Sequence, residues 1–373
     1  MNIKKRPYFL AAILVFTFAL IFRTLMLGLK NADLVFIRTW YDFLLANGYH
    51  GLANGEFSNY PPAYLYLLYI ATLTSKWLDP FIAIKIIPTA FDLFSAWIVY
   101  KIARVKYSDD KPYFFAALFF ALPTIMFNSS GWGQIDGLFG AFLLLCFYFL
   151  LKDRSFWAMA AFGMALSFKV QTIFLLPFVG ILFLRKRIPW QHFLIVPVPY
   201  LVLALPTILL GRSWESILWL YVGQTGQFTD LARNAPNLYV FIPNTFFHPV
   251  FEFGMGIFIL AMLAWAWVNF RAKSPITPEQ LALTALASAM LTVFLLPKMH
   301  DRYFYPADIF AFTTVIFLPE LWFFALLSQI SSGLVYLIFP FAQTRLLALP
   351  AALINTALII VILRSQLQTL RKV

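Results

Sequence analysis

Long apolar runs alternate with short polar turns along nearly the whole chain. A membrane-spanning helix needs about 20 apolar residues, and fewer where neighbouring helices shield its ends. By this rule the pattern predicts twelve spans, several of them short, at residues 8–29, 81–103, 112–128, 137–151, 155–168, 171–184, 190–210, 249–269, 279–297, 305–319, 321–341 and 346–364. We therefore expect an all-α fold, a polytopic membrane helix bundle of about 12 transmembrane helices.

The segment Tyr60 to Leu78 is also apolar enough to span, but it begins with Pro61 and Pro62 and is rich in tyrosine. Amphipathic aromatic rings prefer the membrane interface. We predict that this segment is an interfacial helix within a large first extracytoplasmic loop, residues 30–80.

The distribution of charge supports this topology, because orientation follows Lys and Arg in short loops near span ends. With residues 60–78 on the surface, one side receives 17 of the 28 Lys and Arg residues and five of the 16 acids. Those basic residues are Lys4, Lys5, Arg6, Lys101, Arg104, Lys106, Lys111, Lys152, Arg154, Arg185, Lys186, Arg187, Arg271, Lys273, Arg364, Arg371 and Lys372. This side is predicted to be cytoplasmic and to hold both termini.

Composition excludes a soluble fold. Apolar residues make up 62% of the 373 residues and charged residues 12%, against about 25% charged in soluble domains, and mean hydropathy is +0.80. The net charge of +12 equals the excess on the predicted cytoplasmic side, so it faces anionic lipid and we expect no nucleic-acid partner. The first apolar run continues to Leu29 without a small-residue cleavage site, which predicts an uncleaved first span.

The longer polar connections all fall on the opposite side, which predicts that function is extracytoplasmic. They are loop 30–60, turns 128–137 and 168–172, a partly helical cap loop at 211–249, and the turn 296–306. That last turn, LPKMHDRYFYP, holds Lys298, His300, Asp301 and Arg302. It is either an ordinary polar turn or one wall of a substrate cavity.

Two aspartates lie in the first of these loops. Leu34, Ile37 and Tyr41 recur at helical spacing, so Asp33 stands where a helix begins and is either its N-cap or a chemically active carboxylate. Asp42 is predicted to lie on a solvated helix face.

The turn WGQIDGL, residues 132–138, combines an indole, an amide and a carboxylate. It is either a glycine-rich turn or part of a sugar site, because sugars offer apolar faces and many hydroxyls. Lys169 follows nearby and could simply snorkel towards the interface. Lys85 and Asp92 lie seven residues apart on one face of a predicted span, and we interpret them as a structural intramembrane pair.

Several enzyme classes lack their motifs. The four histidines have no metal-ligand spacing, and no GxSxG, Walker A or Rossmann motif is present. Carboxylates and cations near lipid headgroups suit group transfer from a lipid phosphate, in which a carboxylate takes a hydroxyl proton and cations stabilise the departing phosphate.

The chain resembles the GT-C superfamily of integral-membrane glycosyltransferases in four motifs that follow one another on one predicted side: Asp33, YPPAYLYLL, WGQID and KMHDRY. Within that superfamily it most nearly resembles the PIG-V-type and related bacterial mannosyltransferases. The similarity covers the first 175 residues and the stretch 290–310. Asp301 departs from the glutamate associated with the late motif. We expect one integral-membrane domain over 1–373, with a module at 1–185 that contains the catalytic first loop and a second set of helices at 186–373.

The resemblance implies an inverting transferase that moves one sugar, mannose being favoured, from a polyprenyl phosphate to an extracytoplasmic hydroxyl of a glycolipid, glycan or protein. It implies Asp33 as general base, a donor-phosphate site, and a sugar and acceptor site. The phosphate site comprises Lys298, His300 and Arg302; the second site comprises Tyr60, Trp132, Gln134, Asp136, Lys169, Gln171 and Asp301. No cofactor is required, and a monophosphate leaving group does not demand a divalent metal. The alternatives are a transporter or lipid flippase and a non-catalytic subunit; nothing in the sequence predicts an oligomeric state.

Overall fold

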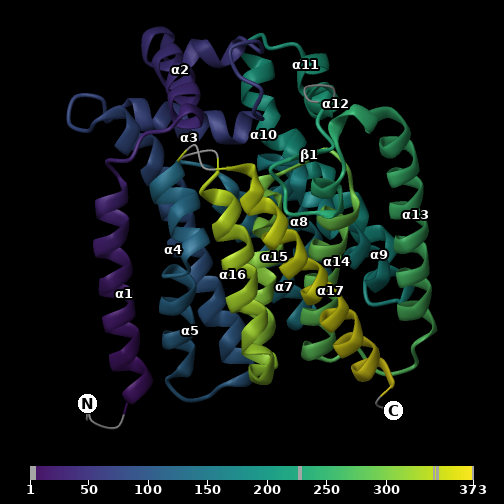
Figure 1. Cartoon of the computed structure of the whole chain (residues 1–373). Coiled ribbons are helices and arrows are strands. Elements are labelled where there is room, and N and C mark those ends of the chain that lie inside the picture. Colours follow the sequence, from purple (N-terminus) through teal and green to yellow (C-terminus); the bar gives the residue numbers. More distant parts are fainter. Residues whose placement is uncertain (1–5, 226–228, 339–340, 342–343, 372–373) are drawn as a thin grey trace. The chain divides into compact units, whose positions relative to one another are not determined.

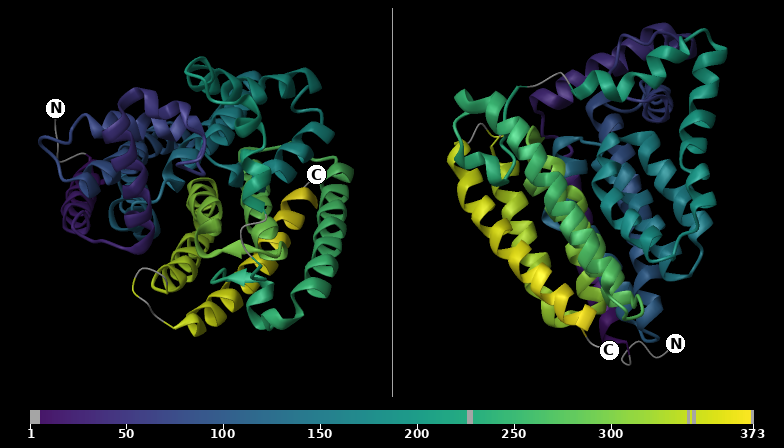
Figure 2. Two further views of the ribbon diagram at one scale, coloured as in Figure 1. Left: turned by 90° about the horizontal axis from the view of Figure 1, so that it is seen from above. Right: turned by 90° about the vertical axis from the view of Figure 1, so that its right-hand side faces the viewer.

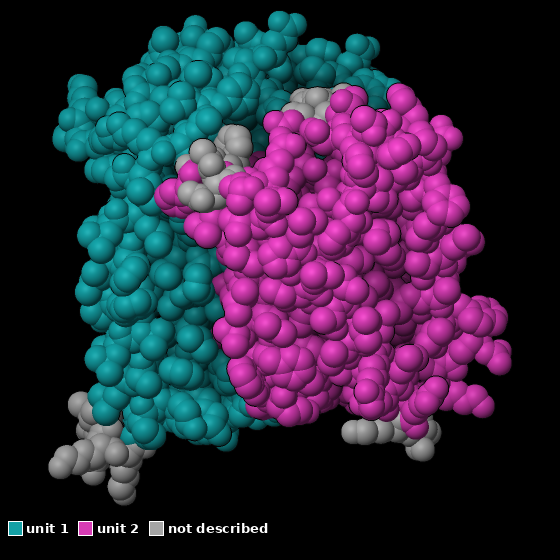
Figure 3. Space-filling model, viewed as in Figure 1, with its two compact units in different colours: residues 1–172, 191–227 teal, residues 173–190, 228–373 magenta. Residues whose placement is uncertain are grey.

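The computed structural model describes residues 6–225, 229–338, 341 and 344–371. Lys4, Lys5 and Lys372 of the predicted cytoplasmic set lie outside these residues, as do small parts of the cap loop and of the predicted span 321–341. The chain divides into two compact units (Figure 3), residues 1–172 with 191–227 as unit 1 and residues 173–190 with 228–373 as unit 2.

Unit 1 is a row of packed helices. α1 (Pro7–Met26), α5 (Lys111–Phe120), α4 (Pro80–Lys106), α7 (Asp136–Leu151), α8 (Ser155–Phe168) and α10 (Pro197–Leu209) contact one another in that order. Shorter elements join them: η2 (Gly48–Ala53), α6 (Pro123–Met126), the π-helical turn η3 (Phe127–Trp132), η5 (Trp190–Ile195), α11 (Trp214–Leu218) and α12 (Leu220–Thr225). η4 (Val170–Leu175) crosses the boundary between the units.

The two ends of unit 1 differ in character. At one end α2 (Ala32–Asn47) packs against α3 (Pro62–Thr72), the predicted interfacial helix (Figure 1). At the other end α1 and α5 both begin, and the Phe9 amide donates to the Asp110 carboxylate at 2.9 Å. Predicted cytoplasmic basic residues Arg6 and Lys111 therefore share one end of the unit, away from α2.

Unit 2 contains a ring of four helices, in which α14 (Pro278–Leu295), α15 (Tyr305–Phe317), α16 (Trp322–Tyr336) and α17 (Ala348–Arg371) each pack against two others (Figure 2). α13 (Phe247–Arg271) packs on α14 and on α9 (Leu176–Leu184). Strands β1 (Ala232–Arg233) and β2 (Met299–His300) pair in parallel. Single turns complete the unit: η6 (Leu238–Phe241), η7 (Asn244–Phe246), η8 (Asp301–Phe304), η9 (Pro319–Leu321) and η10 (Arg345–Leu347).

A helix lies at each of the twelve predicted span positions, and the all-α membrane fold is confirmed. The number of spans is not. Within the described residues, six helices are long and apolar enough to cross a membrane, or seven if α5 and the segment Pro123–Trp132, which meet at 49°, form one span. α7, α8 and Val170–Leu184 are apolar but shorter than 18 residues, so length alone does not make them spans.

Candidate active site

Asp33 lies in the first turn of α2, and it is not the residue that caps this helix. The side chain of Asn31 accepts a hydrogen bond from the Leu34 amide at 3.0 Å, and its amide nitrogen donates to the Trp132 carbonyl at 3.0 Å. Asn31 therefore satisfies the free backbone N–H at the start of the helix. The N-cap interpretation of Asp33 is therefore wrong.

The Asp33 carboxylate reaches the predicted sugar-site turn instead. Its Oδ2 accepts hydrogen bonds from Trp132 Nε1 at 3.1 Å and from Gln134 Nε2 at 2.7 Å. Two donors from one turn thus orient a carboxylate from a different element. Asp42, on the same helix, is half-exposed and pairs with Arg38, which confirms its predicted place on a solvated face.

The turn that carries Trp132 and Gln134 has an unusual backbone. Phe127 to Trp132 form a π-helical turn, a rare geometry that is frequent at functional sites. Gly133 follows with a left-handed φ of 78°, and a Cβ there would lie 2.6 Å from Leu34 Cδ1. Glycine is needed both for this conformation and for the close approach of α2.

Asp136 and Lys169 form a second polar pair next along the chain. The Lys169 ammonium donates to Asp136 Oδ1, and Asn128 Nδ2 donates to Oδ2 at 2.9 Å. Both charged side chains are buried, so the snorkelling interpretation of Lys169 is wrong. Asp136 also lies in the first turn of α7, where the helix dipole favours a negative charge.

Tyr60 and Gln171 are the other two predicted sugar-site residues in unit 1. Tyr60 is half-buried and packs edge-on against Trp40 and Tyr64. Gln171 is buried, and its Oε1 has no hydrogen-bond partner among the described residues. Their predicted role in binding the sugar stays a prediction.

Lys85 and Asp92 do not pair with each other, which corrects the sequence interpretation. The Lys85 ammonium donates to the carbonyls of Met26, Leu27 and Leu29 at 2.6–3.1 Å, where α1 ends. Asp92 accepts from Arg23 at 2.7 Å. Each buried charge is matched by polar groups from another segment of the chain, because a buried charge without a partner is costly.

Arg23 connects Asp92 to the π-helical turn. It was not among the residues predicted from the sequence. Its Nη1 donates to the hydroxyls of Ser129 and Ser130 as well as to Asp92, and its Nη2 donates to the Phe120 carbonyl. A single arginine inside the first apolar run was the only available sequence signal. Asn31 and Asn128 carried no signal of their own.

In unit 2 the turn that holds Lys298, His300, Asp301 and Arg302 is fixed by strand pairing. The Lys298 amide, at a left-handed φ of 64°, donates to the Leu231 carbonyl at 2.8 Å, and His300 pairs in register with Arg233. Asp301 is buried and accepts from the Arg302 amide. The His300 ring lies 4.9 Å from the ring of Tyr303, and Lys298 Nζ lies 5.9 Å from the ring of Phe251.

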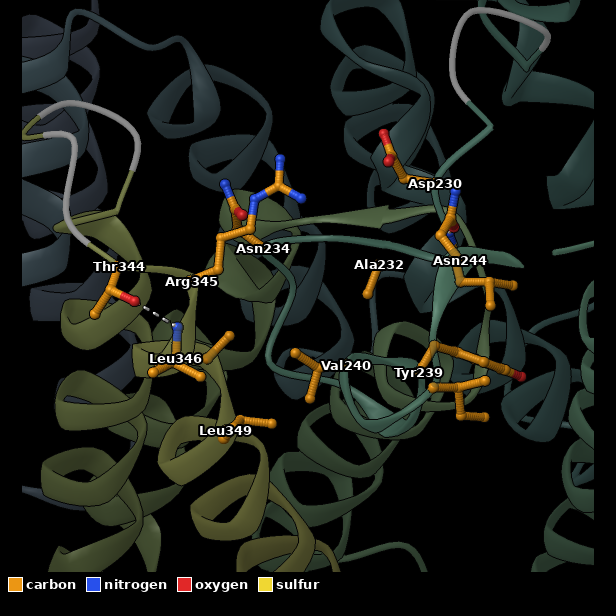
Figure 4. A pocket seen from close by; sticks show the side chains of 13 residues that line it. Asp230, Ala232, Asn234, Tyr239, Val240, Asn244, Thr344, Arg345, Leu346 and Leu349 are labelled. Atoms are coloured by element: carbon orange, nitrogen blue, oxygen red, sulfur yellow. Dashed lines mark hydrogen bonds between the residues drawn. The ribbon is translucent and has the colours of Figure 1, made fainter. Parts of the chain in front are cut away.

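A pocket of about 290 Å³ opens beside the same strand pair (Figure 4). Asp230 and Asn244 lie near each other in its wall, and Arg345 extends from η10 towards Asn234. Apolar side chains, including Leu346 and Leu349, line the remainder. Leu231, Ala232 and Asn234 line the pocket, and Ala232 also belongs to β1, the strand that pairs with Met299 and His300.

Asp33 with its two donors belongs to unit 1, whereas the turn 298–302 belongs to unit 2. The predicted meeting of these two parts in one chamber stays a prediction. Among the residues that the structure describes, no three His, Cys, Asp or Glu side chains are grouped so that they could hold a metal ion.

Comparison with known proteins places the chain in a family. A search of curated proteins found no match. The family model for glycosyltransferase family 87 matches residues 57–297. The match includes Trp132, Gln134, Asp136 and Lys169, and it ends just before Lys298. It supports the predicted GT-C type of membrane glycosyltransferase, while the nearer resemblance to PIG-V-type enzymes stays a prediction. Since the match covers well over half of the sequence, the chain belongs to glycosyltransferase family 87.

Proposed function

We propose that this glycosyltransferase moves a single sugar, mannose being favoured, from a polyprenyl-phosphate donor to an acceptor hydroxyl outside the cytoplasm, with inversion at the anomeric carbon. The acceptor is a glycolipid, a glycan or a protein. The protein would lie in the plasma membrane if it is bacterial, with both termini cytoplasmic.

The observation that carries this proposal is the oriented carboxylate of Asp33. Trp132 and Gln134 donate to its Oδ2, and Asn31 frees it from helix capping. A general base must be held within hydrogen-bond reach of the proton that it takes. A carboxylate positioned by an indole and an amide, at the helix end opposite Arg6 and Lys111, suits an acceptor hydroxyl at a membrane surface.

In the proposed reaction Asp33 takes the proton of the acceptor hydroxyl as that oxygen attacks the anomeric carbon. The bond between this carbon and the phosphate oxygen breaks, and the electron pair leaves with the phosphate. Lys298, His300 and Arg302 would stabilise that phosphate, while Asp136 with Lys169, Tyr60, Gln171 and Asp301 would contact the sugar or acceptor. A departing monophosphate does not demand a divalent metal.

The test is donor consumption by the purified protein with a panel of polyprenyl phosphates that carry mannose, glucose or arabinose. We expect one donor to be consumed. We expect Asp33→Asn to bind that donor but to lose transfer by about 100-fold or more, since a positioned base contributes about 10²–10⁴. Asp42→Asn, on the exposed face of the same helix, is the matched control and should keep full turnover. Unchanged turnover in Asp33→Asn would remove Asp33 from the mechanism.

A further inference from the structure

Among its described residues, unit 1 buries four cationic side chains, and one of them differs from the others. Arg23, Lys85, Lys169 and Arg212 are each at most 7% exposed. Arg23 pairs with Asp92, Lys169 pairs with Asp136, and Lys85 donates to three carbonyls. Within the described part of the chain, Nη1 and Nη2 of Arg212 have no hydrogen-bond partner.

The position of Arg212 is set by the end of α10. Gly211, at a left-handed φ of 106°, follows the helix, and its amide donates to the Ile208 carbonyl at 2.9 Å. The Arg212 amide donates to the Thr207 carbonyl at 3.0 Å. These two bonds form a Schellman motif, which fixes the direction of the chain directly after the helix.

The guanidinium lies among small and aromatic groups. Its Nε donates to Ser216 Oγ at 3.3 Å. A Cβ on Gly55 would lie 3.3 Å from that Nε, so the backbone of loop 54–61 closely covers this side. Tyr66 and Tyr200 lie close enough to influence the guanidinium pKa, but burial is the larger effect and lowers it.

A buried arginine cannot relieve its cost by losing its proton, because its pKa remains too high. Burying a charge without an opposite partner is strongly unfavourable. Because Nε is engaged with Ser216, Nη1 and Nη2 form the remaining edge of the planar guanidinium. Two parallel N–H groups on one edge match two oxygens of a phosphate.

The surroundings indicate where such a phosphate would come from. Arg212 lies just beyond the apolar segment Trp190–Leu209, a candidate span, with Leu210 and Gly211 between them. Trp214 and Trp219, which follow it, are 62% and 66% exposed. Exposed tryptophans at the end of a span mark the level of the lipid headgroups. The oxyanions abundant at that level are lipid phosphates.

We propose that Arg212 anchors a second phosphate site, within unit 1, that takes the phosphate group of a membrane lipid when loop 54–61 moves aside. This is a binding property, and it does not depend on which sugar is transferred or on turnover.

The test compares lipid binding and thermal stability in full-length purified protein and in Arg212→Gln. The probes are undecaprenyl phosphate, phosphatidylglycerol, inorganic phosphate and the uncharged polyprenol. We expect the two lipid phosphates to raise the Tm of the unmodified protein, and polyprenol to leave it unchanged. Arg212→Gln should bind both lipid phosphates at least about tenfold more weakly. Arg212→Lys should recover part of this binding.

The Tm measured without added lipid distinguishes a phosphate-binding role of Arg212 from a purely structural one. An uncompensated buried charge predicts that Arg212→Gln melts at a higher temperature than the unmodified protein, whereas Arg23→Gln melts at a lower one. A lower Tm for Arg212→Gln together with unchanged lipid binding would overturn the proposal. Inorganic phosphate that stabilises as strongly as the lipids would overturn the lipid assignment. A loss of binding in Lys298→Gln with unchanged binding in Arg212→Gln would overturn the Arg212 site and leave the proposed donor-phosphate site intact.

Discussion

The indole Nε1 of Trp132 lies 3.1 Å from Oδ2 of Asp33, although 99 residues separate the two in the chain. The neighbouring Gln134 donates to the same oxygen. The π-helical turn and the left-handed Gly133 allow two nearby side chains to converge on a carboxylate from α2. This convergence gives the candidate active site its most direct test.

Removing either hydrogen-bond donor should slow sugar transfer, because Asp33 would no longer be held in position. We expect Trp132→Phe and Gln134→Leu each to lower kcat by about tenfold to 100-fold, since small displacements of a catalytic group have effects of this size. The measurement is steady-state transfer from the consumed donor. Trp97→Phe, on an exposed part of α4, should behave like the unmodified protein. Combining Trp132→Phe with Asp33→Asn should add no further loss; a fully additive loss would show that the indole acts independently.

Breaking the buried ion pair of Arg23 and Asp92 should lower the free energy of unfolding more than breaking an exposed ion pair does. Arg23→Met and Asp92→Leu should each lower the free energy of unfolding by about 3–5 kcal/mol, because each leaves one buried charge unpaired. The double variant should lose less than the sum, and denaturant unfolding in detergent measures all three. Arg38→Gln, which breaks a half-exposed pair, should cost no more than about 1 kcal/mol. Additive losses for Arg23 and Asp92 would contradict the pairing.

Gly254 should be needed for the geometry around the turn 298–302. Tyr239 Oη donates to the Leu295 carbonyl at 2.7 Å, just before that turn, and burial raises the pKa of Tyr239 to about 12. A Cβ at Gly254 would overlap Oη. We expect Gly254→Ala to destabilise the protein by about 1–3 kcal/mol through overpacking and to weaken donor binding.

Gly256 offers a matched control for this substitution. It lies two residues away on α13, and an added Cβ there meets no atom within 4 Å. Gly256→Ala should therefore stabilise the helix slightly, by about 0.5–1 kcal/mol. Thermal unfolding of Gly254→Ala and Gly256→Ala tests this difference. Equal changes in Tm would rule out the contact with Tyr239 as the cause of the destabilisation in Gly254→Ala.

The apolar pattern predicted helices where the structure has them, because the period and length of apolar runs are local properties. It also predicted that Asp33 stands at the start of a helix and that Asp42 lies on its exposed face. The number of spans stays a prediction. α7 and α8 are shorter than 18 residues, and helices that neighbours bury need not have the length of a complete span.

The sequence by itself determined the membrane class of this protein, the places of its helices, and the residue types that gather at their ends. Only the tertiary structure decided which polar groups meet. It paired Asp92 with Arg23 and not with Lys85, and it made Asn31 the helix cap in place of Asp33. It also left Nη1 and Nη2 of Arg212 buried with no hydrogen-bond partner among the residues that the structure describes. The reason is physical: inside apolar surroundings a polar group must find whatever partner the adjacent helix presents, and spacing along the chain does not say which helix that is.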